Sequence, residues 1–277
     1  MNILQVESYL PDVMEFIDSL AAQYKRGTLQ SEARMAQYVR AFFTLDKLDR
    51  VETFVPGWRK MAFYAQGATL VHVVTALTAL MVAPEYETAT PDHQTLAKWF
   101  VLLHDVEKEI LPGQRDYIHG FRSAVTAGHT IARLGFVLNN RDKAAFDAWA
   151  RLTRLAIKYD PDAKQNIQDN TKLPAILAGI DDLFGANTPG ALIVKTVLLH
   201  MSITVLTRWP QTAPLTDEEI KRYINPELLT LLRIMMNVDN DAWSFFDPVT
   251  KSRHRIETRA VFERLEGIVT DTPVANV

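Results

Sequence analysis

The feature that most constrains the fold of this chain is an apolar, alanine-rich segment that runs from Trp58 to Ala83. Within it, the only titratable side chains after Lys60 are those of Tyr64 and His72. A helix that is apolar on all its sides is stable in water only when other elements surround it. We therefore expect a buried central helix that ends at Pro84, because proline does not continue a helix.

Most of the remaining sequence also shows helical rather than alternating spacing of apolar residues. Ser31 and Thr216 are typical helix starts, and Thr216 is followed by three acidic residues that favour the first turn of a helix. We find no convincing alternating strand and no internal repeat, so the sequence predicts an all-α fold. The expected helical regions are 9–50 in two or three pieces, 58–83, 94 through the His104-Asp105 pair to a stop at 111–113, 122–138, 141–158, 173–184, 191–207 and a helix from 216, with surface loops at 161–170 and 185–190.

Composition excludes several classes of function. The chain has no cysteine, so disulfides and thiolate metal sites are impossible, and a metal would have to be bound by His, Asp or Glu. A net charge of −3 gives no overall attraction to nucleic acid or to anionic membranes. There is no signal peptide, no uninterrupted apolar run of membrane-spanning length and no glycine-rich phosphate loop. We expect a soluble, cytoplasmic protein that binds neither a nucleic acid polymer nor a membrane.

The segment from Trp99 to Glu109 carries the clearest chemical signal. Its apolar run stops abruptly at His104-Asp105, and a buried imidazole and carboxylate are costly unless they are paired or bound to a metal. Lys108 lies four residues after His104, on nearly the same helical face, and could reach an oxyanion bound to that metal. His72, in another apolar helix, and one of the pair Asp181-Asp182 are the natural additional ligands.

The order of these residues resembles the H…HD…D signature of the HD-domain metal-dependent phosphohydrolases. His72 is followed by His104-Asp105 and, after a further helical stretch, by an aspartate. The sequence LLHDVEK is similar to the LLHD-x-x-K core of that family, with Lys108 at the lysine position. The sequence ILAGIDDLFGA resembles its final motif, which Asp181 fits best. The resemblance covers roughly residues 58–200.

This resemblance implies an HD-domain-like helical bundle. We expect one domain over 1–277, with the core at about 58–200 and extra N-terminal helices (1–55) and C-terminal helices (201–277) packed on it. It also implies that a divalent ion (Mn, Co, Fe, Ni, Zn or Mg) is held by four ligands and activates a water that attacks a small phosphoester, most plausibly a nucleotide. The implied ligands are His72, His104, Asp105 and Asp181.

Further candidates follow from the same comparison. Glu107 replaces the glycine of the commonest HD-x-G-K form and is either a solvated helix residue or an acid/base group. His119 and His129 lie where binuclear members place extra ligands, so each is a candidate for a second metal or for the substrate. Arg59 resembles, in position only, an arginine that grips the substrate phosphate, and Arg122 could add positive charge near His129.

The other histidines carry less signal. We interpret His200, in the run VLLHMSITVL, as a core histidine, and His93 and His254 as exposed. The apolar segment 227–237 could form a subunit interface in a homo-oligomer. The region after Asp239, with Trp243, is either a cap over the pocket or packing.

Two alternatives to a hydrolase remain open at this point. Some members of the same superfamily hold two irons and are oxygenases, and His119 and His129 are compatible with such a site. The second alternative is a non-catalytic HD-like scaffold that binds a ligand or a partner protein.

Overall fold

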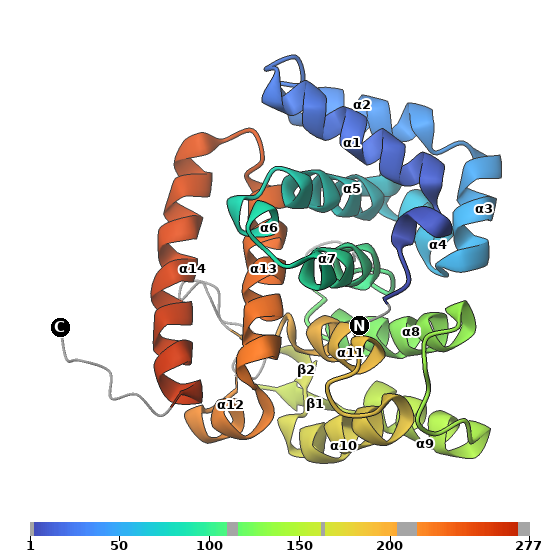
Figure 1. The fold of residues 1–277 in the computed structure, drawn as a ribbon, viewed down its shortest axis with the longest axis vertical. Helices are drawn as coiled ribbons and strands as arrows, with labels where there is room; N and C mark the ends of the chain where they lie inside the picture. The colour runs from blue at the N-terminus through green and yellow to red at the C-terminus, as the bar shows by residue number, and fades with distance from the viewer. Residues whose placement is uncertain (1–2, 110–115, 162–163, 204–214, 271–277) are drawn as a thin grey trace.

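The computed structural model describes residues 3–109, 116–161, 164–203 and 215–270, and its centre is helix α5 (Ala68–Met81). Eleven of the fourteen residues of α5 are buried, and helices α1, α2, α4, α7 and α13 pack around it (Figure 1). This confirms the predicted all-α fold and the buried central helix. The segment Trp58–Met81 would be long and apolar enough to cross a membrane, but 67% of its apolar 18-residue window is buried inside the protein, as in a core helix.

The helices have the following bounds. They are α1 (Pro11–Lys25), α2 (Glu32–Phe42), α3 (Leu45–Phe54), α4 (Trp58–Phe63), α6 (Pro84–Glu87), α7 (Pro91–Leu103), α8 (His119–Leu134), α9 (Lys143–Arg154), α10 (Leu173–Phe184), α11 (Pro189–Leu199), α12 (Asp217–Tyr223), α13 (Pro226–Trp243) and α14 (Pro248–Val269), with short 3-10 turns at Val6–Ser8, Tyr64–Gly67 and Asn170–Lys172. The two strands are β1 (Ile157–Asp160) and β2 (Gln165–Gln168).

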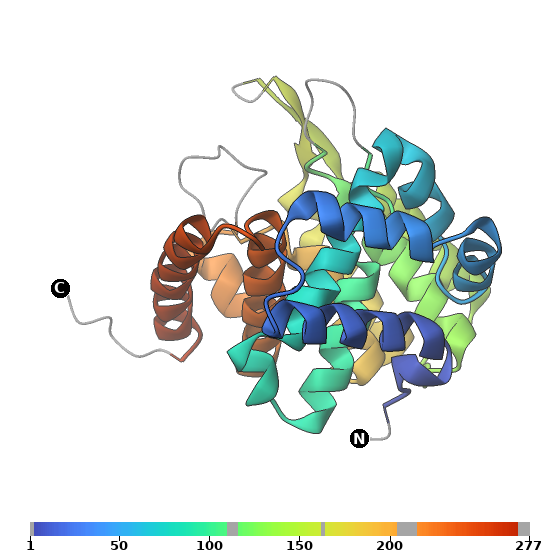
Figure 2. The ribbon, with the colours of Figure 1, turned by 90° about the horizontal axis from the view of Figure 1, so that it is seen from above.

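The helices stack in layers around α5 and α7. The N-terminal helices α1 and α2 cover one side of α5, and α13 and α14 stand side by side at one edge of the molecule (Figures 1 and 2). Helix α11 packs against α7, α8 and α13, while α9 and α10 form the opposite side from α1. Helices α5, α7, α8, α11 and α13 therefore meet in the interior.

Local sequence explains where many helices begin. Ser31 accepts a hydrogen bond from the backbone N–H of Arg34, and Thr216 forms a reciprocal capping box with Glu219, so both predicted helix starts are confirmed. Capping side chains satisfy backbone N–H groups that have no partner inside the helix. Proline occupies the first turn of α7, α11 and α13, where its missing N–H costs nothing.

The central apolar segment is interrupted where a single helix was expected. Between α4 and α5, Ala65 and Gln66 both have left-handed backbone angles, with φ of 46° and 58°. The left-handed region is unfavourable for residues other than glycine, and two successive residues there end one helix and start another in a new direction. Apolar spacing does not reveal such a break, because both helices are apolar.

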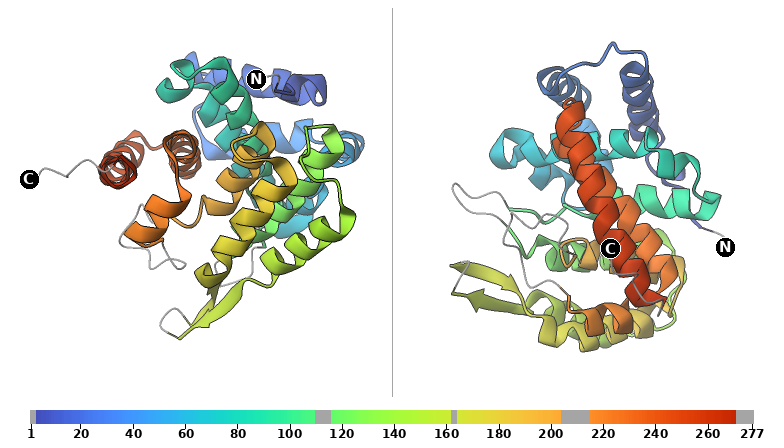
Figure 3. Two further views of the ribbon diagram at one scale, coloured as in Figure 1. Left: turned by 60° about the horizontal axis from the view of Figure 1, so that its bottom comes forward. Right: turned by 90° about the vertical axis from the view of Figure 1, so that its left-hand side faces the viewer.

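A β-hairpin replaces the expected loop at 161–170 and the end of the helix expected at 141–158. The strands β1 and β2 pair antiparallel, with Ile157 opposite Gln168, and the hairpin projects from the helical body (Figure 3). Strand β1 is largely exposed, so it lacks the alternation of apolar and polar residues by which a half-buried strand is recognised.

Several helix ends also differ from expectation. Helix α7 ends at Leu103, so His104 and Asp105 lie just beyond it, and α8 begins at His119, three residues before the predicted start. Helix α11 ends at Leu199, eight residues before the predicted end of the helix expected at 191–207, and the predicted helix stop at 111–113 lies outside the described residues.

The segment 227–237 belongs to α13, and most of its apolar side chains are buried within the chain itself. It packs against α5, α7, α11 and α14. The apolar face that suggested a subunit interface is therefore covered by helices of the same chain, and a homo-oligomer remains a prediction.

Gly57 fixes the backbone next to the HD pair, and its replacement provides a test of the fold. Gly57 has φ of 103°, and a Cβ there would lie 2.6 Å from the carbonyl oxygen of Val106. We expect Gly57→Ala to lower the free energy of unfolding by about 2–5 kcal/mol, because backbone strain and a steric clash add together.

The matched control is Gly27→Ala, since Gly27 has φ of 71° and open space around the missing Cβ. Strain alone should cost that variant about 1–2 kcal/mol. Urea titration of both variants measures the difference, and equal losses would show that the contact with Val106 does not constrain this backbone.

Candidate metal centre

Five histidine and aspartate side chains come together with Asp239 where the interior helices meet. His72 lies on α5, His104 is the C-cap residue of α7, and Asp105 follows it. His119 is the first residue of α8, His200 is the C-cap residue of α11, and Asp239 lies on α13. The centre is thus assembled from five helices that are distant in sequence.

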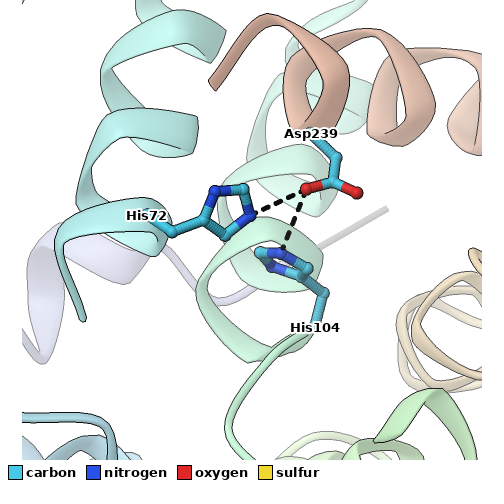
Figure 4. Close-up of side chains that lie close together, drawn as sticks. All are labelled: His72, His104 and Asp239. Atoms are coloured by element: carbon cyan, nitrogen blue, oxygen red, sulfur yellow. Dashed lines mark hydrogen bonds and ion pairs between the residues drawn. The ribbon is translucent and has the colours of Figure 1, made fainter. Parts of the chain in front are cut away.

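The first group consists of His72, His104 and Asp239 (Figure 4). Asp239 Oδ1 lies 2.8 Å from His72 Nε2 and 3.8 Å from His104 Nε2. The three potential ligand atoms lie within 4.8 Å of one another. One divalent ion could contact all three atoms, because metal bonds to nitrogen and oxygen are about 2.0–2.2 Å long.

The second group consists of Asp105, His119 and His200, whose potential ligand atoms also lie within 4.8 Å of one another. His119 Nε2 is 3.0 Å from Asp105 Oδ1 and 3.1 Å from His200 Nε2. All three residues are buried. This group lies deeper than the first, in which the Asp239 side chain is 17% exposed.

Asp105 connects the two groups through its two carboxylate oxygens. Its Oδ2 is 3.6 Å from His72 Nε2 and 3.5 Å from His104 Nε2, whereas its Oδ1 faces His119. A carboxylate in this position can contribute one oxygen to each of two neighbouring ions. The geometry therefore makes Asp105 the shared member of both groups.

Hydrogen bonds at the far side of three histidine rings orient their Nε2 atoms toward the centre. His104 Nδ1 contacts the carbonyl oxygen of Val101 at 2.7 Å, and His200 Nδ1 contacts that of Val197 at 2.6 Å. His119 Nδ1 makes the same contact with the carbonyl of Asp116. A carbonyl only accepts, so Nδ1 is the protonated nitrogen and Nε2 of the neutral ring has a free lone pair.

These tautomers leave lone pairs facing one another. His119 Nε2 and His200 Nε2 are both acceptors at 3.1 Å, and Asp105 Oδ1 is a third acceptor 3.0 Å from His119 Nε2. Such contacts are repulsive unless a cation lies among them. Two nitrogens bound to one ion at about 2.1 Å lie roughly 3.0–3.4 Å apart, which matches the observed spacing.

Two buried polar atoms point to the same conclusion. Among the described residues, neither Nε2 of His104 nor Oδ1 of Asp105 has a hydrogen-bond partner. A buried acceptor without a partner costs about 1–3 kcal/mol, and more when it is charged. Metal coordination would satisfy both atoms, so the buried His and Asp side chains could hold a metal ion.

The electrostatics favour the ligand-competent state of each group. Burial lowers the pKa of His104, and burial together with the charges of His119 and His104 lowers the pKa of His200 to about 3. Burial by itself would raise the pKa of Asp105, but the charges of His104 and Lys108 hold it well below its usual range. At neutral pH the centre therefore presents neutral His104 and His200 rings and an ionised Asp105.

Lys108 lies at the more open side of the centre. Its Nζ is 2.7 Å from Asp105 Oδ2, and its side chain is 18% exposed. Burial opposes its charge, but the carboxylates of Asp105 and Asp239 raise its pKa. Lys108 is thus a stable cation next to the shared carboxylate, as its spacing from His104 suggested.

The structure does not bring Asp181 to this centre, and Asp239 completes the first group instead. Asp181 forms an ion pair with Lys195 at 2.6 Å and is 37% exposed. It lines a separate cleft of about 440 Å³, and Asp182 accepts a hydrogen bond from Asn140. The prediction failed because the carboxylate follows an apolar run that faces α9 and α11 rather than the centre.

Arg59 and His129 also lie away from the centre. Arg59 forms an ion pair with Asp49 at 2.7 Å and is half exposed, so it is not placed to grip a phosphate. His129 lies on the exposed side of α8 with its ring against Phe146, and burial together with the charge of Arg154 lowers its pKa.

Glu107 and Arg122 support the surrounding chain rather than contact the ligand atoms. Glu107 pairs with Lys60 at 3.2 Å and accepts a hydrogen bond from Thr126. Arg122 donates to the carbonyl of Glu107 and to the carboxylate of Asp116, whose own carbonyl orients His119. Neither supports the acid/base or substrate-binding role considered from sequence.

The sequence interpretation missed two members of the centre. His200 is buried, as expected of a core histidine, but its ring faces His119 and His104. A signal was present, because Val197–His200 repeats the tetrapeptide VLLH of 101–104, and both histidines cap a helix in the same way. Asp239 had no comparable signal. His254, expected to be exposed, is buried, and His93 is partly buried.

In comparisons with known proteins, no protein-family model, no curated protein and no solved structure matches this chain. The fold class and the candidate site are therefore assigned from the structure alone. The protein is all-α, and its buried His and Asp side chains could hold a metal ion.

Exchanging one carboxylate tests which aspartate binds metal. Mn²⁺ or Zn²⁺ at about 100 times its dissociation constant should stabilise the folded protein by about 2.7 kcal/mol and raise Tm by about 5–10 °C. We expect Asp239→Asn to remove at least half of this increase, because the first group loses its only carboxylate apart from the shared one.

Asp181→Asn serves as the matched control and should keep the full increase. Differential scanning fluorimetry with and without the ion measures both variants. A full increase in Asp239→Asn together with a lost increase in Asp181→Asn would restore the ligand set expected from sequence.

Proposed function

We propose that the protein is a metal-dependent phosphohydrolase of the HD type that acts on a small phosphoester. The observation that carries the proposal is the position of Asp105 between the two His/Asp groups. A shared carboxylate between two imidazole-rich groups is suited to a pair of neighbouring divalent ions, the arrangement that clamps both oxygens of a phosphoryl displacement.

The donor set also limits the metal. Four imidazoles and two carboxylates without sulfur suit Mn, Fe, Co, Ni or Zn better than the all-oxygen coordination that Mg and Ca prefer. His72, His104 and Asp239 would hold one ion, His119 and His200 the other, and Asp105 both. Bound ions of this kind polarise a phosphoryl oxygen and supply hydroxide near neutral pH.

The protein's own groups would position the substrate. Lys108 carries a positive charge at the more open side of the centre and could contact a phosphate oxygen. The carbonyls of Val101, Asp116 and Val197 fix the ring orientations before substrate arrives, so little reorganisation is needed. The buried surroundings exclude bulk water and strengthen these interactions.

Replacing the shared carboxylate tests this proposal directly. We expect Asp105→Asn to lower kcat on any phosphoester substrate on the order of 1000-fold, because several kcal/mol of transition-state stabilisation depend on the bound ions. Elemental analysis of the same variant should show fewer than half the ions of the wild-type protein. The matched control is Asp181→Asn, which should retain both activity and metal. Full activity in Asp105→Asn would refute the proposed site.

A second function, a di-iron oxygenase, is favoured by the histidine-rich second group. Asp105, His119 and His200 provide a donor set that also suits iron. Metal analysis and oxygen consumption separate the two functions. Two irons per chain with oxygen uptake and no release of phosphate would replace the hydrolase by the oxygenase, and a metal-free protein without ion-dependent stabilisation would favour the non-catalytic scaffold.

A further inference from the structure

An exposed tryptophan lies directly beside the metal centre. Trp243 is the last residue of α13, one helical turn after Asp239, so both side chains project from the same face of the helix. Its ring stacks on His72, with 4.4 Å between centroids and an angle of 26°. Even so, 59% of its surface is exposed.

This exposure is unusual for the tryptophans of the described chain. Trp58 and Trp99 are fully buried, and Trp149 is 4% exposed. Burial of a large aromatic side chain is favourable, yet Trp243 packs on His72 and keeps most of its surface in water next to a polar centre. A ligand that covers the ring when it occupies the centre would account for the position.

Solvent reaches the centre from the side on which Trp243 lies. The side chains of Asp239 and Lys108 are 17% and 18% exposed, whereas those of His104 and Asp105 are fully buried. Lys108 lies near both the metal centre and the indole: its Nζ is 2.7 Å from Asp105 Oδ2 and 5.4 Å from the centre of the Trp243 ring. The indole therefore lies beside the more exposed side of the centre.

We propose that Trp243 is a platform on which the flat ring of a nucleobase stacks, so that the substrate of the centre is a nucleoside phosphate. The inference rests on the proposed function, because it places the phosphate at the metal centre and the base on the indole. Stacking uses the π-face that all bases share. Lys108 lies near both contacts, with its Nζ 2.7 Å from Asp105 Oδ2, so it is placed to contact the phosphate.

The stack on His72 gives the platform a fixed orientation. His72 is held by its 2.8 Å contact with Asp239, and its ring packs against one face of the indole. A preorganised aromatic ring binds a flat ligand without loss of side-chain freedom. A phosphoester without a ring would contact only the centre and Lys108.

The test compares binding of a ring-bearing and a ring-free probe to the metal-loaded full-length protein. The first probe is the phosphonate analogue of AMP, whose P–C bond cannot be hydrolysed, and the second is inorganic phosphate. Calorimetric titration gives both dissociation constants without any turnover.

We expect Trp243→Ala to weaken binding of the AMP analogue about 10- to 100-fold, the usual range for loss of one base stack. Binding of inorganic phosphate should change about twofold at most. Trp243→Phe keeps a flat ring and should stay within about threefold of the wild-type protein for both probes. Equal metal content in all variants shows that loss of the contact with His72 has not emptied the centre.

The matched control is Tyr159→Ala, which removes an aromatic side chain that is 62% exposed but lies on β1, in the hairpin that projects from the helical body (Figure 3). It should bind both probes like the wild-type protein. The platform would be refuted if Trp243→Ala weakened both probes equally or neither, or if the wild-type protein bound the AMP analogue no more tightly than phosphate. A change of oligomeric state in Trp243→Ala with unchanged binding would refute it too, by making Trp243 a contact between copies.

Failure of the proposed function gives a different result. If no phosphoester is hydrolysed but the AMP analogue binds in a manner that depends on Trp243, the platform stands and the hydrolase does not. If phosphoesters are hydrolysed equally well by the wild-type protein and by Trp243→Ala, with and without a base, the hydrolase stands and the platform does not.

Discussion

The buried carboxylate of Asp105 is the constraint on which the rest of this structure depends. An ion removed from water costs several kcal/mol even after relaxation, and the cost is recovered only when other groups compensate its charge. Lys108 supplies part of this compensation, 2.7 Å from Oδ2, whereas the Nε2 atoms of His104 and His119 face the carboxylate as further acceptors. Helices α5, α7 and α8 therefore pack around the buried charge of Asp105. A centre that also contains unpaired acceptors is better explained by bound cations than by packing alone.

The helices contribute through their ends as well as their side chains. His104 and His200 cap the C-termini of α7 and α11, where backbone carbonyls carry about half a negative charge. Two such ends aimed at one region stabilise cations there, and the same carbonyls fix the ring tautomers. The tetrapeptide VLLH thus has the same role at both helix ends. Its apolar residues bury the end of the helix, and its histidine places Nδ1 against the carbonyl of the valine and directs Nε2 toward the centre.

The sequence alone identifies the members of the centre that stand out in their local context. It does not identify a member that only tertiary packing brings there. His72, His104 and Asp105 stand out because a titratable side chain in an apolar helix is costly, and they do lie together. Asp239 lies on α13, whose apolar face resembles that of any core helix, so only tertiary packing shows that its carboxylate reaches His72. Asp181 has the more suggestive local context, yet Lys195 pairs with it at the surface. The β-hairpin was not predicted for a related reason: an exposed strand such as β1 shows no alternation of apolar and polar residues.

The difference in burial between the two groups assigns them different parts of the proposed reaction. The second group is enclosed and its rings face one another, so an ion there would chiefly hold Asp105 and the deep side of the centre in place. The first group lies at the open side, with Asp239, Lys108 and Trp243 around the approach. The proposed substrate would approach this side, and Asp239, which the sequence did not identify, lies one helical turn before Trp243. Helix α13 would then join metal binding to recognition of the substrate, because it carries a ligand and a platform on one face.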